Sequence, residues 1–245
     1  INGAWVRDLT NKGGRGTIVG EVTPVKGRLN EGLKFDGSTG YVTATTPPGI
    51  NGSASITMSA WVYPTVDNGA NKDIVSQGNF GAWSTIGFTM RRISGSLIEC
   101  IIGANGGGTG VYRDSINTVP INKWSHVSCV YNGATGRLDI YVNTVVNQGV
   151  LVGSVPSSMN TINFPVLIGR EDRVSSFFPG SLDDVRIYNR ALSAAEVKQV
   201  YQAEGLAKVA MDNRDVGLVG AWLFDEGGGQ IASDSSGFKN NGTLS

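Results

Sequence analysis

Residues that could do acid–base or nucleophilic chemistry are few and scattered in this sequence. Its single histidine, His126, lies next to an apolar, strand-like run, Val127–Tyr131. One histidine in such a run gives no basis for a Ser-His-Asp arrangement, which places a base beside both a nucleophile and an orienting acid. The glycines Gly106–Gly108 lack the Lys-Ser/Thr pair that completes a phosphate-binding loop. The residues therefore predict a protein that is not an enzyme.

Three loop-like stretches instead carry the residue types that bind sugars. Aromatic rings stack on the faces of sugars, and planar polar groups bond to their hydroxyls. A ring taken alone is better explained by a place in the core or by anchoring a loop, but here three stretches each bring an aromatic or charged group. The candidate ligand-binding residues are Phe80 and Trp83, Tyr112 and Arg113, and Arg170 and Asp172.

Composition excludes several classes of partner. The 245 residues carry 20 Lys and Arg against 20 Asp and Glu, so the formal net charge is zero. Nucleic acids and anionic membrane surfaces both require a basic face, and neither is expected as a partner. No apolar run approaches the roughly 18 residues of a membrane span, so membrane insertion is not expected. Low charge and 35 glycines suit a turn-rich, secreted or cell-surface protein.

Two cysteines, Cys100 and Cys129, each lie inside an apolar, strand-like run. They are consistent with two small buried side chains. They are also consistent with one disulfide between neighbouring strands in an oxidising compartment. A zinc site is not expected, because two isolated thiols lack the spaced ligands that zinc requires.

Short alternating apolar runs, separated by Gly, Asn, Ser and Pro, predict an all-β protein built as a two-sheet antiparallel jelly-roll sandwich. One short helix is predicted near 193–204, because Ser193 and Glu196 form a capping box and Gly205 is a plausible stop. The expected strands are 32–35, 41–44, 55–63, 72–76, 87–93, 96–102, 110–114, 124–131, 137–146, 165–169 and 180–188.

The end of the sequence repeats its beginning. Gly3-Ala4-Trp5-Val6 returns as Gly220-Ala221-Trp222-Leu223, and both are followed by an Asp and a Gly-Thr-Ile or Gly-Thr-Leu run. We therefore divide the chain into a domain at 1–205, a connector at 206–217 and an extra strand segment at 218–245. A strand needs hydrogen-bond partners, so that last segment is expected to pair within the chain, with a neighbouring copy, or with a second domain that it begins.

Several segments together resemble the laminin-G-like jelly roll of the concanavalin A-like lectin/glucanase superfamily. The likeness covers roughly residues 1–204, and Leu218–Leu244 resembles the opening segment of the same family. It implies one convex and one concave sheet, with ligands met at the concave face or at the rim loops. The segments that carry it are Leu33–Gly37, Ser59–Pro64, Trp124–Val127, Leu138–Asn143 and Gly180–Ser193.

The resemblance also bears on catalysis and metal binding. Glucanases of the superfamily share a Glu-x-Asp-x-x-Glu strand, whereas here Glu99 stands alone in its strand. In laminarinase-type relatives an Asp in the last strand helps to hold a structural calcium. The matching residue is Asp183, and Asp36 is a possible second ligand, so calcium is the expected cofactor. The alternative is that both acids cap turns or pair with arginines.

We therefore expect an extracellular, non-catalytic carbohydrate-binding or adhesion module whose partner is a glycan or a cell-surface polysaccharide. The alternative is a structural subunit of an extracellular filament or surface array, in which residues 218–245 pair with another copy of the chain. The duplicated segment and its apolar strand favour that alternative, because an exposed apolar strand is otherwise an aggregation hazard.

Overall fold

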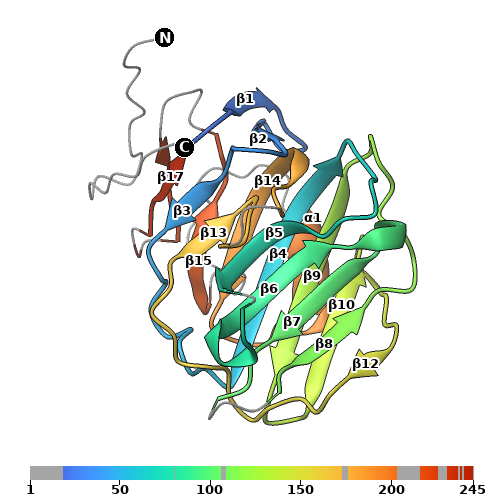
Figure 1. Cartoon of the computed structure of the whole chain (residues 1–245), viewed down its shortest axis with the longest axis vertical. Coiled ribbons are helices and arrows are strands. Elements are labelled where there is room, and N and C mark those ends of the chain that lie inside the picture. Colours follow the sequence, from blue (N-terminus) through green and yellow to red (C-terminus); the bar gives the residue numbers. More distant parts are fainter. Residues whose placement is uncertain are drawn as a thin grey trace.

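Two antiparallel sheets pack face to face in this protein, as the computed structural model shows (Figure 1). The structure describes residues 19–79, 81–105, 109–172, 176–202, 216–225, 231–236, 238 and 240–244. Side chains that alternate along the strands send one set into the space between the sheets, where they form a continuous apolar core. This is the predicted all-β jelly-roll sandwich.

One sheet has eight strands. Its order is β1-β2-β14-β4-β9-β10-β11, and β15 also pairs with β14. The bounds are β1 (Val22–Lys26), β2 (Glu31–Asp36), β4 (Ser55–Pro64), β9 (Ser125–Asn132), β10 (Arg137–Val142), β11 (Val145–Val146), β14 (Pro179–Tyr188) and β15 (Leu218–Trp222).

The other sheet has nine strands in the order β12-β8-β7-β6-β5-β13-β3-β17-β16. Two short 3₁₀ turns, Trp83–Thr85 and Ser94–Ser96, precede β6 and β7. The strand bounds are β3 (Val42–Ala44), β5 (Lys72–Gly78), β6 (Ile86–Arg92), β7 (Ile98–Ile102), β8 (Val111–Asp114), β12 (Leu151–Val152), β13 (Val166–Ile168), β16 (Ile231–Ala232) and β17 (Gly242–Leu244).

The two cysteines form a disulfide that crosses the core from one sheet to the other. Cys100 lies on β7 and Cys129 on β9, with their Cα atoms 6.0 Å apart. Both are fully buried in the apolar core. The sequence was compatible with two buried thiols or with one disulfide, and the structure contains the disulfide. It joins strands of opposed sheets, whereas the sequence analysis expected neighbouring strands.

The helix α1 (Ala194–Gln202) covers the outer face of the eight-stranded sheet. Its buried residues Val197 and Val200 belong to a second apolar cluster, together with Val130, Tyr141 and Tyr188 of that sheet. The predicted helix thus ends at Gln202 among the described residues, and 203–205 lie outside them. No helix in the described part of the chain is both long and apolar enough to cross a membrane.

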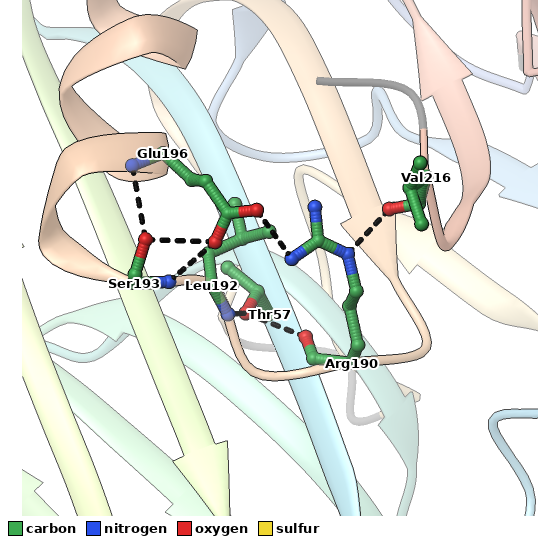
Figure 2. A network of polar contacts seen from close by, with 6 residues as sticks. All are labelled: Thr57, Arg190, Leu192, Ser193, Glu196 and Val216. Atoms are coloured by element: carbon green, nitrogen blue, oxygen red, sulfur yellow. Dashed lines mark hydrogen bonds and ion pairs between the residues drawn. The ribbon is translucent and has the colours of Figure 1, made fainter. Parts of the chain in front are cut away.

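The predicted capping box fixes the start of α1 (Figure 2). The Ser193 hydroxyl accepts from the Glu196 amide at 3.3 Å, and a Glu196 carboxylate oxygen accepts from the Ser193 amide at 2.8 Å. Arg190 pairs with Glu196 at 2.8 Å and donates to the Val216 carbonyl. The same arginine therefore connects the helix start to the residues that lead into β15.

The C-terminal segment pairs with its own chain in this structure, at one edge of each sheet. Strand β15 pairs with β14 in the eight-stranded sheet, and β17 pairs with β3 in the nine-stranded sheet. Trp222 is fully buried in the core between them. The opening copy of this element, residues 1–18, lies outside the described residues.

Candidate functional site

The outer face of the nine-stranded sheet is the face on which a ligand site can form, because α1 covers the other sheet. Met90 and Cys100 point into the core. Their strand neighbours Arg91 and Glu99 must therefore point outward, since side chains alternate along a strand. These outward positions are polar and only partly exposed, which is unusual for a sheet face turned towards solvent.

Four charged residues lie directly opposite one another across adjacent strands of this face. Asp73 on β5 faces Arg91 on β6, Arg91 faces Glu99 on β7, and Glu99 faces Asp114 on β8. We call these four residues the polar row. The register places three carboxylates and one guanidinium in a line across four strands.

Arg91 is the cation of the polar row. One Glu99 carboxylate oxygen lies 2.6 Å from the Arg91 Nη2 atom and 2.6 Å from its Nε atom. The two side chains are 15% and 10% exposed, so water screens this pair only weakly. A charge-assisted contact of this geometry holds Glu99 in a fixed orientation.

Asp73 is the most deeply placed acid of the row. It is fully buried, and the Ser176 side chain is its hydrogen-bonding neighbour. Burial raises its pKa to about 7; Arg91 opposes that rise, while Glu171 and Glu99 add to it. Near neutral pH this carboxyl group can therefore either donate or accept a hydrogen bond.

Glu99 and Asp114 are a second pair of acids at close quarters. Burial raises the pKa of Glu99; Arg91 opposes the rise, and Asp114 adds to it. Burial also raises the pKa of Asp114. The sequence placed Glu99 alone in its strand, and only the register of β7 and β8 brings Asp114 opposite to it.

One predicted aromatic residue, Tyr112, lies beside the polar row, and a second, Trp83, packs further along the same strand. Tyr112 is half-buried and shares the outer face of β8 with Asp114, two residues further on. A Cβ atom at Gly110 would lie only 2.5 Å from the Trp83 ring, so this ring packs against the backbone at the start of β8. Tyr112 beside Asp114 and Trp83 at the start of the same strand thus form an aromatic border along β8.

The other predicted binding residues occupy three different places. Arg113 points to the opposite side of β8, where its Nη1 atom donates to Gln148 Oε1 at 3.1 Å. The Arg170 guanidinium stacks over the Tyr41 ring at 4.5 Å. Exposed Asp172 accepts from the Asn79 side chain at 3.2 Å, linking its loop to the loop that carries Trp83. Phe80 lies outside the described residues.

The two predicted calcium ligands have different surroundings. Asp183 is buried, its Oδ2 accepts from the Leu29 amide at 2.8 Å, and its Oδ1 has no hydrogen-bond partner among the described residues. Asp36 instead caps its own turn, accepting from the amides of Ser38, Thr39 and Gly40. Burial works to raise the pKa of Asp36, but a bond from the Ser38 hydroxyl and these amide bonds outweigh it and hold the pKa well below its usual range.

Metal ligation by side chains alone is not supported in the described part of the chain, where no three His, Cys, Asp or Glu residues converge. Asp183 nevertheless fits a cation better than Asp36, because it keeps one buried carboxylate oxygen without a donor. Backbone carbonyls of the kind that calcium accepts would have to supply the remaining ligands.

Comparison with known proteins identifies the family. The family model described as concanavalin A-like lectin/glucanases superfamily matches residues 36–198. The chain belongs to this superfamily. Among curated proteins no sequence matches it.

Solved structures of this superfamily fold are similar to the chain at low sequence identity. A Bacteroides ovatus protein provisionally assigned to carbohydrate binding is 20% identical with a TM-score of 0.59; the match covers 86% of this chain and 56% of that one. The CBM40 of a Ruminococcus gnavus sialidase, bound to α2,3-sialyllactose, is 16% identical with a TM-score of 0.56, covering 69% and 96%. Domain 4 of the Geobacillus stearothermophilus arabinanase AbnA, bound to arabinotriose, is 17% identical with a TM-score of 0.52, covering 80% and 86%. Likenesses this distant establish the fold alone.

The polar row predicts an unequal response to the loss of two arginines. Arg91→Met leaves Glu99 and Asp73 without their cation, and we expect the free energy of unfolding to fall by about 3 kcal/mol at pH 7. The loss should shrink at acidic pH, where these acids are neutral. Urea denaturation at several pH values measures it.

The matched control is Arg137→Met, because Arg137 also pairs with an Asp but its side chain is 60% exposed. Its loss should cost no more than about 0.5 kcal/mol. Equal, small losses for both variants would contradict the view that the row is a weakly solvated charge network.

Proposed function

We propose that this protein is a non-catalytic carbohydrate-binding or adhesion module that meets its glycan on the outer face of the nine-stranded sheet. The observation that carries the proposal is that Tyr112 lies beside Asp114 of the polar row on one outer face, with Trp83 packed at the start of the same strand. Superfamily membership and solved structures of similar fold that hold sugars support it.

The residues of this face match what a sugar offers. A pyranose ring has an apolar face that stacks on an aromatic ring, and its hydroxyls both donate and accept hydrogen bonds. Glu99 and Asp114 accept when ionised, and each can donate when it holds a proton. Asp73 is fully buried, out of reach of a ligand. Arg91 adds fixed donors. This favours a neutral or hydroxyl-rich glycan contacted by stacking at Tyr112 and by hydrogen bonds along the row.

We assign the acids of the row to binding rather than to hydrolysis. Glu99 is held by Arg91 in a close ion pair, which orients the carboxylate and restricts its freedom to act as a nucleophile. Its neighbour Asp114 lies directly across the strand pair. A fixed pair of acids beside one arginine suits recognition of adjacent hydroxyl groups.

An extracellular location is part of the proposal. The disulfide Cys100–Cys129 is the kind of bond that persists in an oxidising compartment. A formal charge of zero leaves no electrostatic reason for the protein to bind nucleic acid or anionic lipid. Both features suit a secreted or cell-surface binding module.

A second candidate function is a structural subunit whose copies exchange residues 218–245. The favouring observation is that this segment contributes a fully buried tryptophan, Trp222, and pairs with an edge of each sheet. An element that completes the core of its own chain can complete the same core in a neighbour, which is the principle of domain swapping.

We also propose calcium as a structural cofactor at Asp183. The Asp183 carboxylate, whose Oδ1 is unpartnered, lies beneath the turn between β1 and β2, where a Cβ atom at Gly27 would meet the Glu31 carbonyl at 2.4 Å and Asp183 Oδ2 at 2.5 Å. A cation there would draw one ligand from Asp183 and the others from backbone oxygens. It would hold this turn against β14.

Glycan binding should depend on the aromatic border. Trp83→Ala and Tyr112→Ala should each weaken binding about tenfold or more, since each removes a stacking surface. A glycan array that includes α2,3-sialyllactose and arabinotriose, followed by calorimetry with the best ligand, measures this. Phe238→Ala serves as the control, because Phe238 is 53% exposed and belongs to the segment at the opposite end of the same sheet. Wild-type affinity in both aromatic variants would refute the proposed face.

Exchange of residues 218–245 should make assembly depend on concentration. At micromolar concentration we expect ordered oligomers by sedimentation and electron microscopy, and Trp222→Ala should shift them towards monomers because it removes the anchoring side chain. A full-length chain that stays monomeric at every concentration would eliminate the second candidate and leave glycan binding unaffected.

Calcium binding should stabilise the folded chain through Asp183. We expect saturating Ca²⁺ to raise Tm by several degrees, because a ligand that binds only the folded state stabilises it by mass action. Asp183→Asn should remove the shift, whereas Asp172→Asn, at an exposed acid, should retain it. An unchanged Tm on chelation of the wild-type protein would rule the site out.

A further inference from the structure

Residues 218–244 dock on a defined surface of their own chain, which we call the acceptor. It consists of Val185–Tyr188 of β14, which pair with β15, and Val42–Ala44 of β3, which pair with β17. These two edges belong to different sheets, so one segment closes both.

A few residues of the segment carry most of this docking. Trp222 is fully buried, and its indole N–H donates to the Asn240 carbonyl at 2.9 Å. A Cβ atom at Gly220 would lie 2.7 Å from the Trp222 ring, so a glycine is required two residues before the tryptophan. Asp234 accepts from the Ala221 amide at 2.7 Å and also caps the following loop. Gly242–Leu244 then form β17.

The beginning of the chain contains the same anchors in the same order. Gly3 and Trp5 match Gly220 and Trp222, including the glycine that the ring requires. Eight positions separate Asp8 from Gly16, just as eight separate Asp234 from Gly242. Both copies end on a similar run, Gly16-Thr17-Ile18 in one and Gly242-Thr243-Leu244 in the other.

The pairing of Val19, the first residue that the structure describes, also points to the acceptor. Val19 forms an antiparallel bridge with Tyr41. If the chain before Val19 kept that register, Ile18 would face Val42, Thr17 would face Thr43 and Gly16 would face Ala44. In the structure, Leu244, Thr243 and Gly242 occupy those three places in that order.

Only one of the two copies can pair with β3 at a time. The opposite edge of β3 is already paired with β13, where Val166–Ile168 face Ala44–Val42. Two different strands cannot share one edge, because each backbone donor and acceptor there has a single ladder partner.

We propose that the acceptor takes residues 3–18 as an alternative occupant, in competition with residues 218–244 of the same chain. When residues 3–18 occupy the acceptor, the C-terminal segment is released and becomes a ligand for the acceptor of a second copy. The competition between the two segments does not depend on the proposed exchange of residues 218–245 between copies. The release of the C-terminal segment to a second copy does depend on that proposed function.

The C-terminal segment is the stronger occupant of the two. Residues 223–233 separate its tryptophan from its aspartate, and they include the fully buried Phe224. They also include Asp225, which accepts from the Glu31 amide at 3.0 Å. Only Val6 and Arg7 occupy that interval in the opening copy. The opening copy is therefore expected to be a minor occupant that takes over when the C-terminal segment is weakened.

A three-cysteine competition tests the proposal in the full chain. In a chain that carries Thr17→Cys, Thr43→Cys and Thr243→Cys, the cysteine at position 43 can form a disulfide with only one of the other two. Directly opposed residues of a sheet are close enough for such a bond. Peptide mapping without reduction measures the two bonds. The native pair Cys100–Cys129 is already oxidised and serves as an internal reference.

We expect the bond between positions 43 and 243 to dominate. Adding Trp222→Ala should raise the share of the bond between positions 17 and 43 at least tenfold, and adding Trp5→Ala to that variant should reverse the rise. A ratio that Trp222→Ala leaves unchanged would overturn the proposal. So would a Trp222→Ala chain that loses its fold by circular dichroism, because residues 3–18 should then replace the weakened segment.

Mixing isotopically labelled with unlabelled chains separates competition from exchange. Bonds between positions 43 and 243 that join labelled to unlabelled chains would support release to a second copy. If those bonds form only within chains while the ratio still responds to Trp222→Ala, the exchange candidate fails and the shared acceptor stands.

Discussion

The burial of Trp222 at the junction of the two sheets is the contact on which the rest of this structure depends. Its strand, β15, pairs with β14, and β14 also pairs with β2 and β4. The Trp222 indole N–H donates to the Asn240 carbonyl, and the Asn240 side chain donates to Asp234. Asn240 lies just before β17, which pairs with β3. Removing a fully buried aromatic side chain costs about 3–5 kcal/mol, a large part of the stability of a typical domain. One side chain thus holds both sheets at the same end of the sandwich.

The proposed glycan face depends on a second constraint, which is the burial of charge. Asp73, Glu99 and Asp114 lie where water has limited access, and an unpaired ion there is costly. Arg91 offsets that cost for Glu99 by a direct ion pair, while Asp73 responds by a pKa near neutrality. Glu99 and Asp114 are the acids of this face that keep some exposure, and they are the groups available to the hydroxyls of a sugar.

The strands and the helix were accessible from sequence because they follow local rules. Alternating apolar runs located most strands, and the capping box at Ser193 located the start of α1. Strand β1 was missed because Pro24 interrupts it and most of its side chains are exposed at the sheet edge.

Trp83 and Tyr112 were found by residue type. Asp73, Arg91 and Asp114 were not, because each is an isolated charge until the strand register sets it opposite the next. Register depends on contacts distant in the sequence, which no local pattern contains.

Hydrogen exchange of the amides of Val219 and Trp222 tests most directly whether the fold depends on the C-terminal segment. In dilute, monomeric protein we expect them to be protected to a level close to that of global unfolding, because β15 is part of the sandwich that closes the core. Exchange as fast as that of an open loop, with β4 and β9 still protected, would contradict this dependence. It would show that the two sheets stay together without the tryptophan at their junction.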